Sequence, residues 1–212
     1  MRRFFLLFST IIIAITFSSC IDLVEEVTIN KNLSGHYELR LEAEGLAGMM
    51  NMGGQVSMPD MRKLDQKLNM LKHQKGIHNV QKKIKLENMK FFISFDFDNE
   101  KSLNNAIYTL AEVKPSIFIK KFLKVRKNKV VRPNLNPYLQ KFIEEEDLMA
   151  QLPSSDLLNY VNYKLIVNTP TELRRAKGKK AIIQSNKKTV ISSHSFKDIM
   201  LNDENLSLKV RM

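Results

Sequence analysis

The 212-residue chain has one cysteine, no tryptophan, seven glycines and six prolines. A single cysteine excludes an intramolecular disulfide and a cysteine-based metal cluster. No metal-ligand spacing connects the four histidines, His36, His73, His78 and His194. The sequence also lacks the short motifs of P-loop, dinucleotide-binding, GxSxG and HExxH proteins. We therefore expect no metal, no cofactor and no enzymatic activity.

Long apolar runs are scarce, and the main one lies at the N-terminus. Arg2 and Arg3 precede an apolar run from Phe4 to Phe17, and two small serines follow it, which is typical of a secretory signal peptide. The run has 14 residues, fewer than the ~20 that an α-helix needs to cross a bilayer. We therefore predict a signal peptide over residues 1–19 and not a permanent membrane span.

Cys20 ends this segment. The tetrapeptide Phe17-Ser18-Ser19-Cys20 resembles the lipobox of bacterial lipoproteins, in which the signal is cut before the cysteine and lipid is joined to it. The resemblance implies that Cys20 carries acyl chains such as palmitate. It also implies an extracytoplasmic protein anchored in the bacterial cell membrane or outer membrane. An ordinary secretory signal with an incidental cysteine is the alternative.

The chain after residue 19 is basic, with 32 basic and 22 acidic residues and a formal charge of +10. The full sequence has 25 lysines and nine arginines. This ratio suits a solvated surface or attraction to anionic lipid better than bidentate phosphate recognition. An export signal conflicts with nucleic acid as a partner.

The apolar pattern predicts one α+β domain over residues 20–212. We expect a largely antiparallel sheet built from β-hairpins, with two or three amphipathic helices packed on it. A first hairpin turns at 30–35, and further strands are expected at 77–86, 89–98, 160–167, 181–184, 189–193 and 206–210. Aromatic residues on both faces of 89–98, with Phe97 on the face of Phe92, predict a central strand.

Two helices have clear apolar stripes. The first follows a capping box at 57–60 and carries Met61, Leu64, Leu68 and Leu71. The second follows Asp98 or Asn99 and carries Leu103, Ala106, Ile107, Leu110 and Ala111. A third helix is expected to open at Asn136-Pro137 within a helical insert over 136–153, whose acidic residues 144–147 we interpret as a solvated face.

Two segments leave alternatives open. Residues 117–132 fit a basic hairpin that turns at Lys127-Asn128, or a basic amphipathic helix beside anionic headgroups. Residues 45–58 hold four glycines and four methionines, Met49, Met50, Met52 and Met58. Flexible methionines adapt to irregular apolar partners, so these residues are candidate contacts for a lipid or another hydrophobic ligand. The alternative is that they fold back onto the core of the domain.

The stretch Ser192-Ser193-His194-Ser195 combines hydroxyls with a histidine. Adjacent residues of a strand point to opposite faces, so a serine next to His194 cannot pair with it as nucleophile and base. We interpret the stretch as surface residues of a strand.

The order of elements resembles the LppM-type bacterial lipoproteins. The resemblance lies in Cys20 followed at once by the hairpin that turns at 30–35, in Val167-Asn168-Thr169-Pro170, and in Asn186-Lys187-Lys188-Thr189-Val190. It implies an α+β envelope domain that binds bulky hydrophobic or lipid-like ligands, and it transfers no site residues.

We therefore expect a lipid-anchored, non-catalytic protein of the cell envelope that binds a lipid or another apolar ligand. A scaffolding or assembly lipoprotein, which contacts another envelope protein or component through its basic surface, is the alternative. The first hypothesis predicts an apolar pocket near residues 45–58. The second predicts a filled core and a flat surface patch.

Overall fold

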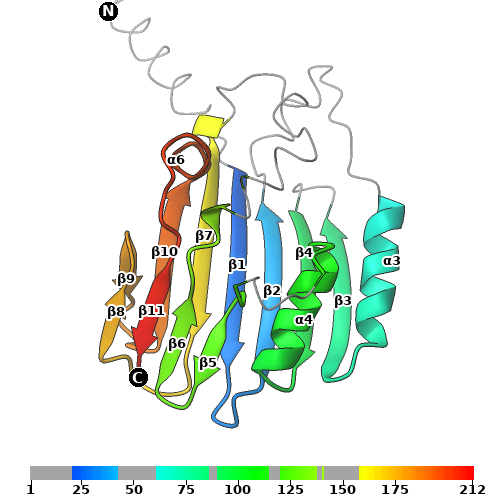
Figure 1. Ribbon diagram of the computed structural model, residues 1–212, viewed down its shortest axis with the longest axis horizontal. Helices are drawn as coiled ribbons and strands as arrows, with labels where there is room; N and C mark the ends of the chain where they lie inside the picture. The colour runs from blue at the N-terminus through cyan, green and yellow to red at the C-terminus, as the bar shows by residue number, and fades with distance from the viewer. Residues whose placement is uncertain (1–20, 43–60, 86–89, 115–119, 138–139, 141–157) are drawn as a thin grey trace, which may run out of the picture.

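A computed structural model describes residues 21–42, 61–85, 90–114, 120–137, 140 and 158–212 (Figure 1). Seven strands form a large mixed sheet: β1 (Ile21–Ile29), β2 (Gly35–Glu42), β3 (Ile77–Lys85), β4 (Lys90–Phe97), β7 (Val161–Asn168), β9 (Ala181–Ile183) and β10 (Thr189–Ser195). Their order is β3-β4-β2-β1-β7-β10-β9. β1 and β7 are parallel, and the other neighbours are antiparallel.

A second sheet has four strands: β5 (Lys124–Arg126), β6 (Lys129–Arg132), β8 (Arg175–Lys177) and β11 (Leu208–Arg211). Their order is β5-β6-β11-β8, and all neighbours are antiparallel. The described helices are α3 (Met61–Lys72), α4 (Glu100–Leu110) and α6 (Phe196–Leu201). In these ranges no helix is long and apolar enough to cross a membrane.

The small sheet and two helices cover the same face of the large sheet. Figure 1 shows the small sheet in front of β1, β7 and β10, α4 in front of β4, and α3 beside β3 at the edge of the sheet. One cluster of buried side chains fills the space between these layers. It includes Val27, Tyr37, Phe95 and Leu165 from the large sheet, Val130 and Val210 from the small sheet, and Leu71 and Leu103 from the helices. The α+β fold with a mostly antiparallel sheet is therefore confirmed.

The first hairpin forms where the sequence predicts it. Asn30 N–H donates to the carbonyl of Ser34 over 2.8 Å, and Leu33 takes the left-handed conformation with φ of 68°. Gly35 then allows a close approach, because a Cβ there would lie 2.0 Å from the carbonyl oxygen of Thr28 and 2.5 Å from the Phe97 ring.

Both predicted helices in the described ranges are confirmed. Asn99, not Asp98, is the N-cap of α4, and its side chain forms a capping box with Ser102. Leu103 and Ala106 are buried. The helix ends at Leu110 with Ala111 as its C-cap. The apolar stripe of α3 buries Leu68 and Leu71.

The basic hairpin is confirmed in place of the amphipathic helix, since β5 and β6 pair around residues 127–128. The predicted central position of β4 is confirmed, because the strand pairs with β2 on one side and with β3 on the other. One detail of this strand was wrong. Phe97 points to the core with Phe95, because the odd-numbered residues of this strand share one face. Among the aromatic residues of β4, only Phe92 lies on the opposite face.

Several predicted features lie outside the described residues. They are the signal peptide 1–19, Cys20, the capping box, Met49, Met50, Met52 and Met58. Of the predicted helical insert 136–153, only Asn136, Pro137 and Gln140 are described, and their backbone is helical.

Candidate functional site

The outer face of the small sheet carries seven cationic side chains. Because side chains alternate between the faces of a strand, Val125, Val130, Leu208 and Val210 point to the core. Their neighbours point outward: Lys124, Arg126, Lys129, Val131, Arg175, Lys177, Lys209 and Arg211. We call the seven cations of this set the basic face.

Strand pairing arranges these side chains in two rows. Lys124, Val131, Lys209 and Lys177 are consecutive partners across the four strands, and so are Arg126, Lys129, Arg211 and Arg175. Neighbouring strands lie ~4.8 Å apart, and residues two positions apart lie ~7 Å apart. The basic face therefore spans roughly 14 by 7 Å at the level of the backbone.

Within the described part of the chain, no carboxylate forms an ion pair with any cation of the basic face. The outer face of the large sheet differs. There Arg40 pairs with Glu26 at 2.8 Å and with Glu38 at 2.5 Å, and Lys164 pairs with Asp22 at 2.5 Å. Arg40 and Lys164 are thus neutralised on that surface, whereas no cation of the basic face is paired with a carboxylate of the described residues.

Mutual repulsion is visible at Lys129. Lys209 lowers the pKa of the Lys129 ammonium below its usual value, and desolvation and the charges of Arg126, Arg211 and Lys124 act in the same direction. An anion on the basic face would relieve this repulsion.

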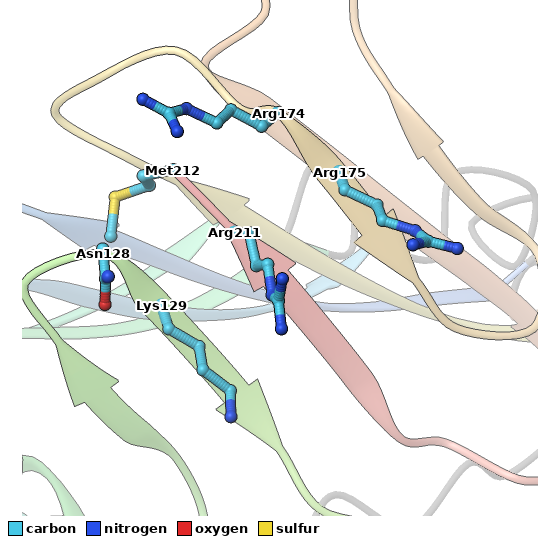
Figure 2. Close-up of a pocket in the computed structure, with 6 residues that line it drawn as sticks. All are labelled: Asn128, Lys129, Arg174, Arg175, Arg211 and Met212. Carbon is cyan, nitrogen blue, oxygen red and sulfur yellow. The ribbon is translucent and has the colours of Figure 1, made fainter.

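One end of the basic face borders a hollow of about 570 Å³, lined by Asn128, Lys129, Arg174, Arg175, Arg211 and Met212. Figure 2 shows Lys129 and Arg211 leaving adjacent strands side by side, with Arg175 on the next strand and Arg174 directed away from them. Arginine guanidinium groups suit phosphate and carboxylate ligands, since they donate two parallel hydrogen bonds.

The basic face is remote from residue 21. Arg132 in β6 pairs with Glu25, the fifth residue of β1, over 3.0 Å. The two rows cross β6 at Val131 and Lys129, one and three residues before Arg132. Both positions lie farther from Ile21 than Arg132 does. At ~3.3 Å per residue, they lie roughly 15 to 25 Å from Ile21. Figure 1 shows the same separation, with the starts of β1 and β7 at one end and the C-terminus at the other.

A buried polar cluster joins the two sheets behind this face. Arg132 donates to Glu25 and, at 3.3 Å, to the hydroxyl of Tyr163. Tyr163 and Tyr37 donate to the Glu25 carboxylate at 2.5 and 3.2 Å. Arg132 also stacks on Phe122, with 3.6 Å between its guanidinium carbon and the ring centroid.

This cluster holds Arg132 charged and both tyrosines protonated. Burial alone would lower the pKa of Arg132, but Glu25, Tyr163 and Tyr37 raise it above its usual value. Burial, and then Glu25, raises the pKa of Tyr37 and Tyr163. We interpret the cluster as a structural clamp between the sheets, because all its hydrogen bonds are internal.

A second buried cluster contains Ser192, His194 and Glu204. Ser192 Oγ lies 2.8 Å from His194 Nε2, and His194 Nδ1 lies 3.0 Å from Glu204 Oε1. With the proton on Nδ1, the imidazole donates to the carboxylate and accepts from the serine hydroxyl. Lys179 also donates to Glu204.

The interpretation of this stretch as surface residues was therefore wrong. Ser192 and His194 are 3% exposed and Glu204 is 2% exposed. Ser193 and Ser195, next to His194, point to the opposite face of β10, whereas Ser192 lies two positions away and shares the face of His194. The order serine, histidine, carboxylate is that of a hydrolase triad, but a catalytic serine must reach its substrate, and this one is covered by protein.

Sequence reasoning missed both buried clusters and the extent of the basic face. The alternating cations of 124–126, 129–132 and 209–211 were the available signal. Their convergence depends on β11 pairing with β6 and β8, which are distant in sequence. Met49, Met50, Met52 and Met58 are not placed by the structure.

No protein-family model matches the chain, and no curated protein matches it. Among solved structures, the folded domain of LppM from Mycobacterium tuberculosis is distantly similar. That comparison covers 91% of this chain and 88% of the other at a TM-score of 0.38 and 11% sequence identity. This similarity does not establish the family, so the LppM-type resemblance stays a prediction.

Proposed function

We propose that this chain is a non-catalytic lipoprotein of the bacterial envelope that binds a polyanionic envelope component on its basic face. The observation that carries the proposal is the pair of cationic rows, for which the described residues provide no paired carboxylate. Seven like charges on four short strands repel one another, and such a surface becomes favourable when an anion neutralises it.

Distance from the anchor supports a partner other than the anchoring membrane. With lipid on Cys20, Ile21 lies at the membrane surface, and the basic face lies roughly 15 to 25 Å from it. Attraction to charged headgroups is screened over ~8 Å at physiological ionic strength. A polymer rich in phosphate or carboxylate, in the space beyond the headgroups, fits the position of the face better.

Polyphosphate binding by the detergent-extracted full chain tests this proposal. Replacing Lys177, Lys209 and Arg211 with Gln should weaken binding about 10- to 100-fold at 0.15 M salt, because three exposed charge contacts of up to ~1 kcal/mol each are lost. The salt dependence of binding should become shallower, since fewer counterions are released. Fluorescence anisotropy of labelled polyphosphate measures both quantities.

A matched control separates the basic face from net charge. Replacing Lys72, Lys83 and Lys101 with Gln removes the same charge from exposed positions on α3, β3 and α4. This variant should bind within about threefold of wild type. Equal weakening by both variants would mean that only net charge matters. Binding of anionic vesicles but not polyphosphate would indicate a membrane partner instead.

Binding of an apolar ligand by residues 45–58 is the second candidate function. Leu41, which precedes that segment in the sequence, is 37% exposed and is available for an apolar contact. Replacing Met49, Met50 and Met52 with Ser should weaken binding of a fluorescent lipid probe and change stability by less than ~1 kcal/mol if these side chains are at the surface. A loss of several kcal/mol would place the methionines in the core.

A further inference from the structure

A row of apolar side chains crosses the large sheet at the end where β1 begins. Leu23, Leu41, Phe91 and Ile84 are consecutive partners across β1, β2, β4 and β3. They point to the same side as the core, yet Leu41 and Ile84 are 37% and 44% exposed. The row therefore extends the inner apolar surface beyond the buried part of the core.

Two more exposed apolar residues lie at the same end, on the other side of β1. Tyr160 directly precedes β7 and is 48% exposed, and Leu201 ends α6 and is 60% exposed. Figure 1 shows α6 beside the start of β7, the strand next to β1. Leu41 and Ile84 thus flank Ile21 on one side, and Tyr160 and Leu201 flank it on the other.

Ile21 is fixed to this end of the sheet. Its N–H donates to the carbonyl of Tyr160 over 2.7 Å, and it is aligned with Val161 in the parallel pair. Cys20 is the preceding residue, and consecutive Cα atoms are 3.8 Å apart. A lipid on Cys20 would hold Ile21 at the headgroup region. Leu23 and Leu41 would then lie ~7 Å farther from the bilayer centre along the strands, at the level of the outer headgroups.

From this geometry we infer that the apolar end of the domain, formed by Leu41, Ile84, Tyr160 and Leu201, lies against the headgroup layer of the bilayer that holds the Cys20 lipid. The inference rests on the proposed lipid anchor. Amphipathic segments place apolar side chains in this interfacial region, and tyrosine is enriched there. Contacts on both sides of Ile21 hold the strands upright, so the basic face stays away from this membrane.

Spin labels test the contact in the full, acylated chain reconstituted in phosphatidylcholine vesicles. Leu41, Ile84 and Leu201 are replaced by Cys one at a time, and Lys31→Cys labels the opposite end of β1 as the control. The measured quantity for each label is the ratio of its collisions with oxygen to its collisions with a water-soluble nickel complex. This ratio should be at least threefold higher at the three test positions than at Lys31. All four positions lie at turns, strand ends or exposed helix residues, so the fold should tolerate the label.

The inference would be overturned if, on vesicle-bound protein, the three labels showed the same ratio of oxygen to nickel collisions as the Lys31 label. Shielding from both oxygen and nickel would also overturn it, because a bound ligand or another protein segment would then cover the row. The wild-type chain checks the anchor itself. If its Cys20 reacts with the spin label and the protein does not float with vesicles, the proposed anchoring is wrong, and the inference that rests on it fails for that separate reason.

Discussion

Replacing Arg132 with Met is expected to lower the free energy of unfolding by about 3 to 5 kcal/mol, because it leaves the Glu25 carboxylate, whose side chain is only 13% exposed, without a counter-charge. Arg132 is the only described residue of the small sheet that forms an ion pair with the large one. Its loss also removes the contact with Phe122 and a hydrogen bond to Tyr163. Urea denaturation at pH 7 measures the change.

Arg126→Met is the matched control. Arg126 lies in the same hairpin but is exposed, so its replacement should change stability by less than about 0.5 kcal/mol. The double variant Arg132→Met, Glu25→Gln should recover much of the lost stability, because neither side chain is then charged. If the double variant is as unstable as Arg132→Met, packing on Phe122 stabilises the fold and the ion pair does not.

The first hairpin, both long helices and the basic hairpin could be predicted because their signals are local. Apolar alternation, a capping residue and turn residues lie within a few positions of one another, as around Asn99 and at 30–35. The parallel pairing of β1 with β7 joins residues about 140 positions apart. No local pattern encodes that pairing, and none encodes the pairing of β11 with β6 and β8 in the second sheet.

The candidate site was predictable only in its composition. The basic residues of 124–132 were recognised, but two further strands from the C-terminal third complete the basic face. Glu25 alternates with apolar residues on the inner face of β1, and an acid at such a position is a signal for a buried partner. Its partner, Arg132, could not be named without the packing of the two sheets. The helix α6, six residues long, is too short to produce a clear apolar period.

The buried Ser192, His194 and Glu204 cluster should make stability depend on pH. Burial lowers the pKa of His194 below its ordinary 6.5, although Glu204 acts to raise it. The unfolded chain therefore binds a proton near pH 6.5, where the folded chain does not. The contribution of neutral His194 to the free energy of unfolding is complete above pH 6.5. It is lost as the pH falls from 6.5 toward the pKa of His194 in the folded chain.

Glu204 adds a second step at lower pH. Its burial would raise the pKa of the carboxyl, but hydrogen bonds from Lys179 and His194 bring it below the ordinary 4.5. Its stabilisation is thus complete above pH 4.5 and is lost as the pH falls through the folded pKa. His194→Gln should remove the upper step in urea denaturation between pH 4 and 8, whereas the exposed His73→Gln should leave it unchanged.

Glu204→Ala should lower the free energy of unfolding by about 2 to 3 kcal/mol at pH 7, since it leaves the His194 N–H buried without an acceptor. As a control, Glu172→Ala at an exposed position should lower it by less than about 0.5 kcal/mol. These effects are expected if the cluster stabilises the fold and performs no chemistry. A fluorophosphonate tests that distinction, because it modifies an activated serine only where a substrate could also reach it. Ser192 should remain unlabelled in the folded chain. A covalent adduct on Ser192 that disappears in His194→Gln would instead identify an accessible nucleophile and its base, and would contradict the non-catalytic function proposed for this protein.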